Sequence, residues 1–195
     1  MTISALQSAR AKYQPKLPNS LKSSVKLVEG NKTESVADQK DILGLFPNTY
    51  GMPLITFEAT DEKQSYPAVN VGVILSGGQA PGGHNVISGI FDGIKNINSD
   101  SKLYGFLGGP GGLVDHKYVE LTSEIIDAYR NTGGFDIIGS GRTKLEETAQ
   151  YDKGTEIMKA LNIKALIIIG GDDSNTNACV LAEYYAAKNT GINMN

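Results

Sequence analysis

The sequence predicts an α/β fold in which a mainly parallel β-sheet lies between two layers of helices. Two observations carry this prediction. From residue 67 onward, short apolar runs rich in β-branched residues alternate with segments whose apolar residues recur at helical spacing. The alternation shows no internal repeat, and it is typical of parallel strands joined by helices that cover both faces of the sheet. Ligands bind to such sheets beyond the carboxyl ends of the strands, so the functional residues are sought there.

Four strands and four helices are expected in this region. The predicted strands are residues 70–76, 102–107, 135–138 and 164–169. The predicted helices are residues 82–97, 119–130, 148–161 and 174–188. Pro81 is expected at the start of the first helix. Met158 and Cys179 fall on apolar helix faces, and both are expected in the core.

Residues 1–66 are interpreted as an N-terminal extension that packs on the α/β domain, residues 67–195, or on a partner. The first 40 residues carry seven Lys and Arg against three Asp and Glu, whereas the chain as a whole has a net charge of −3. Residues 3–13 are expected to form a short helix with Leu6 and Ala9 facing inward. The basic bias is typical of a solvated surface.

Composition excludes several classes of protein. A pI near 5.4 argues against nucleic-acid binding, which usually requires a basic face. Cys179 is the single cysteine, so a disulfide framework is excluded and a reducing cytoplasm is expected. No apolar run is long enough to span a membrane, and the N-terminus does not resemble a secretory signal.

The first candidate site is the loop that joins the first predicted strand to the first predicted helix. Residues 77–83 contain four glycines in seven positions. Gly77 and Gly78 lack side chains that would keep an anion away from the backbone, and the start of the helix offers free N–H donors. The loop therefore indicates phosphate binding, although a tight strand-to-helix turn is the alternative.

The second candidate site follows residues 135–138. Arg142, Thr143 and Lys144 supply two cations and a hydroxyl after a glycine-flanked turn. An arginine fork matches the oxygens of a phosphate, and a lysine adds a mobile charge. A surface ion pair with Glu146 or Glu147 would explain the same residues.

The third candidate site follows the most apolar strand, residues 164–169. Asp172, Asp173 and Ser174 come directly after Gly170-Gly171. Adjacent carboxylates need a cation or a helix cap nearby, and Mg²⁺ takes one or two carboxylates together with water and phosphate oxygens. Ser174 or Asp173 acting as a plain N-cap is the alternative. Taken together, the three loops predict a site for an anionic phosphate and a metal ion.

Other chemistries lack their sequence signatures. The chain has no P-loop motif, no dinucleotide-binding fingerprint and no nucleophile elbow. His84 and His116 are far apart and have no cysteine partners, which argues against zinc. His84 is expected either to touch a phosphate or to be a partly exposed helix residue.

The three loops resemble those of the phosphofructokinases. The segments that carry the resemblance are Leu75–Gly83, Gly141–Lys144 and Gly170–Asn177, in this order. More narrowly, they are similar to the long, pyrophosphate-dependent fructose-6-phosphate 1-phosphotransferases, over roughly residues 67–195. The resemblance implies a phosphofructokinase-like αβα fold, and it makes this region the N-terminal part of the donor-binding domain.

The activity that the resemblance implies is Mg²⁺-dependent phosphoryl transfer from pyrophosphate to the 1-hydroxyl of fructose 6-phosphate in glycolysis and gluconeogenesis. Gly77 and Gly78 would then contact the donor phosphates, and Asp172 would hold the metal ion. Asp173 would set the choice of donor.

The resemblance also implies roles for residues of the second loop and of the start of the last predicted helix. Arg142 would neutralise charge on the transferred phosphate, and Thr143 and Lys144 would line the same site. Ser174 would present its amide or its hydroxyl. The resemblance also suggests a homo-oligomer.

One departure from the family pattern changes the expected activity. Family members place the aspartate that deprotonates the sugar hydroxyl in a Thr-Ile-Asp-Gly-Asp loop after the next strand, and this loop does not occur in the sequence. The chain is therefore interpreted as a fragment that is inactive by itself. A nucleoside-triphosphate kinase with a Gly-Gly-Asp loop and a non-catalytic, phosphate-binding regulatory subunit are the alternatives.

Overall fold

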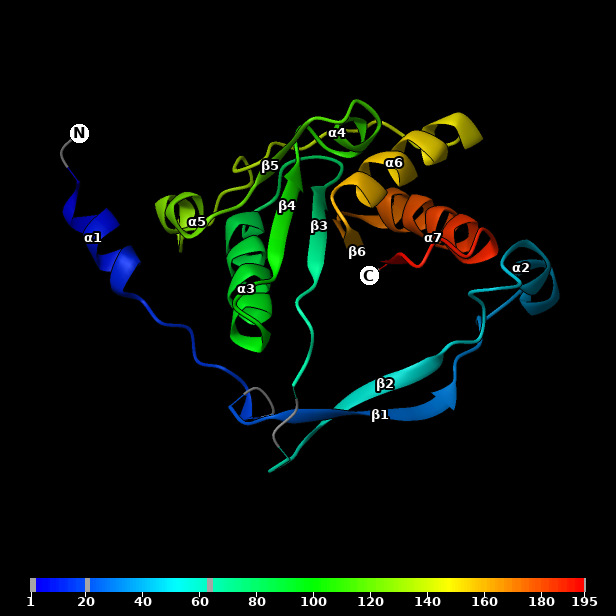
Figure 1. Ribbon diagram of the computed structural model, residues 1–195, viewed down its shortest axis with the longest axis horizontal. Helices are drawn as coiled ribbons and strands as arrows, with labels where there is room; N and C mark the ends of the chain where they lie inside the picture. The colour runs from blue at the N-terminus through cyan, green and yellow to red at the C-terminus, as the bar shows by residue number, and fades with distance from the viewer. Residues whose placement is uncertain (1–2, 20–21, 63–64, 195) are drawn as a thin grey trace. The chain divides into compact units, whose positions relative to one another are not determined.

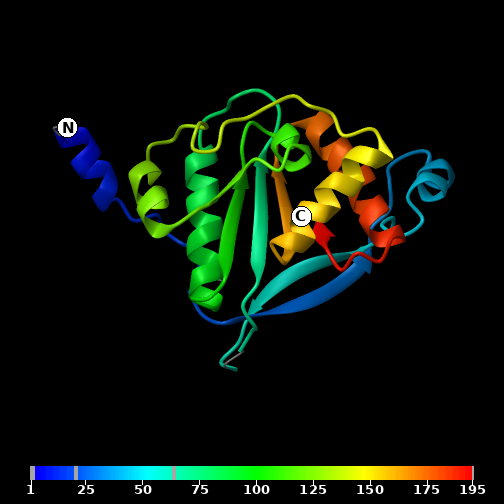
Figure 2. The same ribbon diagram turned by 45° about the horizontal axis from the view of Figure 1, so that its top comes forward.

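The computed structural model describes residues 3–19, 22–62 and 65–194, which form two compact units. The larger unit consists of Met1–Tyr13 and Pro67–Asn195, and the smaller unit of Gln14–Tyr66. Figures 1 and 2 show the larger unit as a sheet with helices on both sides.

The larger unit contains a five-stranded, mostly parallel sheet, as predicted. Its strand order is β5-β4-β3-β6-β7, and only β5 runs antiparallel to its neighbour. The strands are β3 (Asn70–Leu75), β4 (Lys102–Phe106), β5 (Tyr118–Glu120), β6 (Ile163–Ile169) and β7 (Asn193–Met194). The helices of this unit are α1 (Ala5–Lys12), α3 (Gly83–Ile97), α4 (Pro110–Val114), α5 (Ser123–Tyr129), α6 (Thr148–Ala160) and α7 (Asp172–Ala187).

Alternating side chains of the strands divide the hydrophobic core into two clusters, one on each face of the sheet. On β3, Val73 and Leu75 join the cluster that contains Ile87 of α3, whereas Ile74 joins the cluster that contains Met158 of α6 and Leu181 of α7. This period of two is the geometry of an extended strand buried on both faces. The three-layer prediction and the prediction that Met158 is a core residue are therefore confirmed.

Two predicted elements of the larger unit are wrong. The predicted helix 119–130 is divided into β5 and α5, because Val119 pairs with Gly105 of β4 and the Thr122 hydroxyl caps the helix that begins at Ser123. The predicted strand 135–138 does not form. Its apolar residues are buried, but its backbone runs as an irregular loop.

Helix boundaries and helix faces supply further corrections. Gly82, with φ of 94°, is the N-cap of α3, so Pro81 lies before the helix rather than at its first position. Cys179 is exposed on α7 instead of lying in the core. The helix predicted at residues 3–13 is present as α1, but none of its described residues is buried, and Leu6 is 59% exposed.

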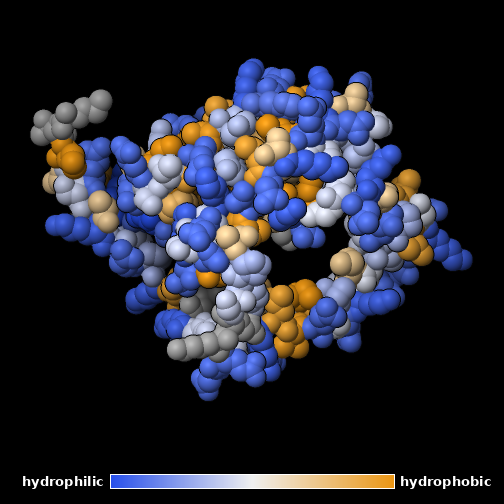
Figure 3. Space-filling model, in the orientation of Figure 1, coloured by the Kyte–Doolittle hydropathy of each residue, from blue (hydrophilic) through white to orange (hydrophobic). Residues whose placement is uncertain are grey.

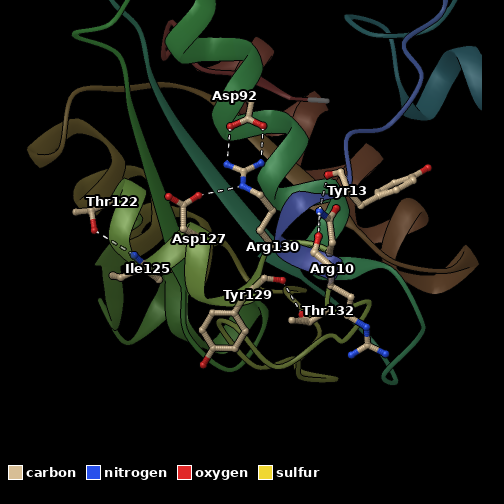
Figure 4. A network of polar contacts seen from close by, with 10 residues as sticks. Arg10, Tyr13, Asp92, Thr122, Ile125, Asp127, Tyr129, Arg130 and Thr132 are labelled. Atoms are coloured by element: carbon tan, nitrogen blue, oxygen red, sulfur yellow. Dashed lines mark hydrogen bonds and ion pairs between the residues drawn. The ribbon is translucent and has the colours of Figure 1, made fainter. Parts of the chain in front are cut away.

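Polar contacts hold α1 against the rest of the larger unit. The Asn131 side chain donates hydrogen bonds to the backbone oxygens of Arg10 (2.8 Å) and Tyr13 (3.0 Å), at the C-terminal end of α1. Next to it, Arg130 forms a bidentate ion pair with Asp92 of α3, at 2.7 and 2.9 Å, which raises the pKa of the Arg130 guanidinium (Figure 4). The turn after α5 is thus tied to both α1 and α3.

The smaller unit contains strands that the sequence did not predict. Strand β1 (Val25–Lys32) pairs antiparallel with β2 (Pro53–Ala59), and α2 (Gln39–Leu45) lies between them in the chain. None of the described residues of this unit is buried, and Leu27 and Phe57, which pair with each other, are 65% and 56% exposed. Hydrophobic residues gather over the β1–β2 ribbon in Figure 3. Among the helices of the described ranges, none is long and apolar enough to cross a membrane.

The buried Tyr185 predicts a loss of stability at alkaline pH. Burial raises the pKa of this phenol above its usual value of 10.0, so the folded chain keeps a proton that the unfolded chain releases. The contribution is present below about pH 10 and is lost as the pH rises above it, by about 0.8 kcal/mol between about pH 9 and pH 10.5. Urea unfolding should show this dependence reduced in Tyr185→Phe. The exposed Tyr13 supplies the control Tyr13→Phe, in which the dependence should remain; an equal dependence in both variants would contradict the assignment.

Candidate functional site

The site lies at the carboxyl ends of β3 and β6, which are neighbours in the sheet. Leu75 pairs with Ile169 at the last position of the two strands, and the Ser76 amide donates to the Ile169 oxygen at 2.8 Å. The loop that begins at Ser76 and the loop that begins at Gly170 therefore start side by side. This proximity follows from the parallel register of the two strands.

The second predicted loop joins the same place through its backbone. Gly141 forms a parallel bridge with Ser76, and the Gly77 amide donates to the Gly141 oxygen at 2.8 Å. Gly77 has φ of +90°, a conformation that favours glycine. A side chain at Gly78 would begin 3.0 Å from Nη2 of Arg142. The absence of a side chain at Gly78 thus lets the Arg142 guanidinium lie on the backbone of the first loop.

A fourth glycine-rich segment, Gly108–Gly112, packs against the second loop and was not among the predicted site residues. A Cβ atom at Gly109 would overlap the Gly141 backbone, and one at Gly141 would overlap the Gly108 oxygen. A Cβ atom at Gly111 would lie 3.0 Å from Oγ1 of Thr143. Four glycines in five residues were the signal that could have indicated this close backbone approach.

The third predicted loop becomes the first turn of α7. Gly171 is the N-cap, so Asp172, Asp173 and Ser174 are the first three residues of the helix. The alternative that Ser174 or Asp173 is the N-cap is therefore wrong, and the predicted start of the helix at 174 is two residues late. Both carboxylates are exposed in the first turn, where the helix dipole favours negative charge.

Ser174 links the third loop to the first. Its hydroxyl donates to Oγ of Ser76 at 2.8 Å, and both side chains are buried. A Cβ atom at Gly170 would lie 2.8 Å from the Ser76 oxygen, so glycine is required at this position. With its hydroxyl engaged by Ser76, Ser174 has its backbone amide left to offer to an anion at the helix start.

The cationic side chains of the second loop are not paired with the acidic residues that follow them. Within the described part of the chain, neither Arg142 nor Lys144 forms an ion pair with Glu146 or Glu147. Arg142, Thr143 and Lys144 are all exposed. The surface ion pair considered above is thus absent, and the two positive charges face solvent next to the glycines.

The far end of this cationic segment is anchored to α7. The Asn177 side chain accepts a hydrogen bond from the Leu145 amide at 3.0 Å and donates one to the Leu145 oxygen. The Tyr151 hydroxyl donates to the same oxygen at 3.0 Å, and burial raises the pKa of this phenol. Asn177 thus anchors the residue that follows the cationic segment, and it was not among the predicted site residues.

A cavity of about 460 Å³ opens between the first and third loops. Its glycine and serine rim continues into an apolar wall from the start of α3 and from Phe135. The lining residues are Ser76, Gly78, Ala80, Pro81, Gly82, Gly83, Val86, Phe135, Ile169, Gly170 and Gly171. The site therefore combines a hollow lined by glycine backbone with two exposed cations and two exposed carboxylates in the adjoining segments of the second and third loops.

The two histidines lie in different surroundings. His84 is buried, only 3% exposed, beneath the first loop, which corrects the expectation of a partly exposed helix residue. Nε2 of His116 forms a hydrogen bond with the backbone oxygen of Lys153, at 3.0 Å. In the ranges that the structure describes, no group of three or more His, Cys, Asp and Glu side chains could hold a metal ion.

Comparison with known proteins identifies the family. The model of the family "Phosphofructokinase" matches residues 70–194. The chain belongs to the phosphofructokinase family. The predicted resemblance to its pyrophosphate-dependent members is confirmed by relatives named "Pyrophosphate--fructose 6-phosphate 1-phosphotransferase". The relative from Porphyromonas gingivalis is 63% identical over 98% of this chain, and the one from Entamoeba histolytica is 46% identical over 96%.

Solved phosphofructokinase structures share the fold. A pyrophosphate-dependent phosphofructokinase from Marinobacter aquaeolei matches 65% of this chain and 32% of its own length, with a TM-score of 0.57 and 21% identity. The Pichia pastoris phosphofructokinase matches 68% of this chain and 15% of its own, with a TM-score of 0.54 and 26% identity. This phosphofructokinase-family chain spans about 35% of the length of the two curated relatives described above.

Proposed function

We propose that this chain is the N-terminal part of a phosphotransferase that moves a phosphoryl group from pyrophosphate to the 1-hydroxyl of fructose 6-phosphate. The observation that carries the proposal is the 63% identity to a relative with that name, over nearly the whole chain. The geometry supports it, because the first and third glycine loops line one cavity, Arg142 lies against Gly78 of that lining, and α7 begins directly after Gly171. In this reaction the sugar oxygen bonds the transferred phosphorus as the bridging bond of pyrophosphate breaks. The hydroxyl proton passes to a base, and phosphate is released.

The donor phosphates are held by groups of this chain. Gly77 and Gly78 expose backbone to them, Arg142 and Lys144 place positive charge beside them, and Ser174 offers its amide. Thr143 lies against Gly111 at the edge of the same loops. Charge neutralisation and positioning account for most of the catalysis of phosphoryl transfer, so these are the groups that the reaction requires.

Asp172 is proposed to hold Mg²⁺, with Asp173 as the donor-selecting residue beside it. Both carboxylates are exposed at the helix start, and this set fits an ion that takes one or two carboxylates and completes its shell with water and phosphate. When bound, the ion would neutralise charge on the phosphate oxygens.

Further properties of the whole protein are proposed on the same basis. Its partners would be pyrophosphate and fructose 6-phosphate, and it would act as a homo-oligomer, with no nucleic-acid or membrane partner. The single cysteine supports a cytoplasmic location, and the acidic pI argues against a nucleic-acid partner.

The 195-residue chain by itself should have no phosphofructokinase activity. The Thr-Ile-Asp-Gly-Asp loop that supplies the base in family members does not occur in it, and loss of a general base alone costs roughly 10²–10⁴-fold. A coupled assay of fructose 1,6-bisphosphate formation measures this. The matched control is the full-length protein of which this chain is proposed to be the N-terminal part, called the longer protein below, in which we expect the missing loop. Turnover by the purified chain at the rate of the longer protein would contradict the fragment interpretation.

Donor specificity tests the proposed function and separates it from the two alternatives. The longer protein is assayed with fructose 6-phosphate and either pyrophosphate or ATP. We expect turnover with pyrophosphate, and release of phosphate from pyrophosphate in equal amount to the sugar bisphosphate. Turnover with ATP alone would favour the nucleoside-triphosphate kinase, and binding of phosphate without turnover would favour the regulatory subunit.

A further inference from the structure

The buried His84 is the one imidazole that lies under the site, and the proposed function gives it no task. It is the second residue of α3, directly after the Gly82-Gly83 pair that lines the cavity. Its backbone amide donates to the Gly134 oxygen at 2.9 Å, and the Gly82 amide donates to the Gly133 oxygen at 2.8 Å. The start of α3 is thus docked on the loop that leads to Arg142.

The hydrogen bonds around the ring assign its proton. Nδ1 lies 2.6 Å from Oγ1 of Thr132, and that hydroxyl donates its single proton to the Tyr129 oxygen at 2.6 Å, as the dashed line in Figure 4 shows. Nδ1 therefore carries a hydrogen and donates it to Thr132. In the neutral ring, Nε2 is then left as an acceptor.

Nε2 accepts two backbone hydrogen bonds from the loop. The Asp136 amide donates to it at 2.9 Å and the Ile137 amide at 3.1 Å. These two amides belong to the segment predicted as a strand, so the imidazole replaces the partners that a sheet would have supplied. The Gly134 position is as tightly filled, because a Cβ atom there would lie 2.5 Å from Cε1 of the ring.

The Asp136 carboxylate competes with the two backbone amides for Nε2 of His84. Its Oδ1 lies 2.8 Å from Nε2, although the side chain is 71% exposed. It can accept a hydrogen bond from the ring only if Nε2 carries a proton, and a protonated Nε2 leaves both amides without their acceptor. Asp136 is the charged side chain within reach of the ring among the described residues, and Tyr129 packs edge-on against it at 4.8 Å between centroids.

We propose that His84 is a positioning residue for Arg142, which it serves by holding the Asp136 and Ile137 amides on Nε2. The next residue, Ile138, is buried, and its oxygen accepts a hydrogen bond from Gly108 at 2.9 Å. Gly141 then bridges to Ser76, and Arg142 lies on Gly78. The segment from the ring to the guanidinium is therefore held at residues 136, 137, 138, 141 and 142, and its role in catalysis rests on the proposed function.

Two substitutions test the two ring nitrogens of His84 separately. In His84→Gln, the side-chain oxygen can reach the place of Nε2 and accept from both amides. In His84→Asn, the shorter amide reaches only the place of Nδ1 and can bond Thr132. Thr132→Val removes the Nδ1 partner and keeps the shape, so it is the matched control. The measurements are amide hydrogen exchange at residues 136 and 137 and steady-state kinetics, both in the longer protein.

We expect His84→Asn to speed exchange of the two amides by about tenfold or more, since they lose their acceptor. Its kcat should fall roughly 10- to 100-fold with a smaller change in the KM for fructose 6-phosphate, because misplacement of a catalytic group acts on the reacting phosphate. His84→Gln should stay close to wild type in both measurements, and Thr132→Val should keep both amides protected.

Three results would overturn the proposal. The first is wild-type exchange at both amides in His84→Asn, and the second is fast exchange with unchanged kcat. The third is a His84→Gln protein that loses protection of both amides while Thr132→Val keeps it, and this comparison decides the matter if His84→Asn does not fold. A wild-type protein that protects both amides but has no activity with pyrophosphate would reject the proposed function while supporting the anchoring of the loop by His84.

Discussion

Asp173→Gly in the longer protein should lose pyrophosphate-dependent turnover and gain measurable turnover with ATP. Asp173 is exposed in the first turn of α7, beside the proposed Mg²⁺ ligand Asp172 and the glycines that bring backbone to the phosphates. An ATP α-phosphate in this space would meet the carboxylate at short range, and in a partly desolvated site the repulsion amounts to several kcal/mol. Pyrophosphate has no α-phosphate and avoids this repulsion. Steady-state kinetics with each donor measure the change.

The control for this prediction is Asp173→Asn, which keeps the volume and removes the charge. If charge excludes ATP, the asparagine variant should gain part of the ATP activity; if volume excludes it, only glycine should. Because Gly171 is the N-cap, neither substitution removes a helix cap, and the loss of a favourable charge in the first turn should cost about 0.3–1 kcal/mol of stability. Unchanged pyrophosphate kinetics without ATP use in Asp173→Gly would reject the specificity role.

Arg142→Ala should lower kcat of the longer protein by roughly 10²–10³-fold, with a much smaller effect on fructose 6-phosphate binding. Its guanidinium lies on Gly78 and forms no ion pair with the neighbouring glutamates, so its charge is available to a bound phosphate. An interaction that strengthens as charge builds on the transferred phosphate appears in kcat more than in KM. Steady-state kinetics and equilibrium binding of fructose 6-phosphate separate the two quantities.

Two variants make the Arg142 result specific. Arg142→Lys keeps the charge but loses the planar fork, and its turnover should lie between those of wild type and Arg142→Ala. Arg10→Ala removes an arginine from α1, at the other end of the larger unit's chain, and should leave turnover unchanged. Equal kinetics of Arg142→Ala and Arg10→Ala would show that Arg142 takes no part in the reaction.

The sequence predicted best those elements whose partners are nearby in the chain or whose pattern is strong. Strands β3 and β6 are almost wholly apolar and were predicted within a residue, and the convergence of their loops follows from parallel strand geometry. The start of α7 was predicted two residues late, because Gly171 is an N-cap without a side chain to mark it. The β1–β2 ribbon was not predicted, since Val25 and Leu27 are separated by Lys26 and lie in a segment that otherwise resembles a polar extension.

The parts of the site that were not predicted depend on contacts across the chain. Residues 135–138 have the composition of a strand, but the amides of Asp136 and Ile137 bond a histidine of α3 instead of a neighbouring strand. Asn177 contacts Leu145, which is 32 residues away in sequence, so no local pattern indicates the contact. Spacing predicts which loops meet, whereas the side chains that hold them in place become apparent only in the folded chain.

The glycine contacts between the loops bear on how the donor preference of this protein can be redesigned. At Gly109, Gly141 and Gly170, any added side chain would overlap neighbouring atoms, so libraries that randomise these positions will return mostly misfolded proteins. Asp172 and Asp173 are exposed instead, and no neighbouring backbone fills the space beyond Gly171, where a Cβ atom would meet nothing within 4 Å. A search for new phosphate donors should therefore be confined to the exposed start of α7 around Asp173, and it should leave unchanged the buried Ser174, which links the first and third loops.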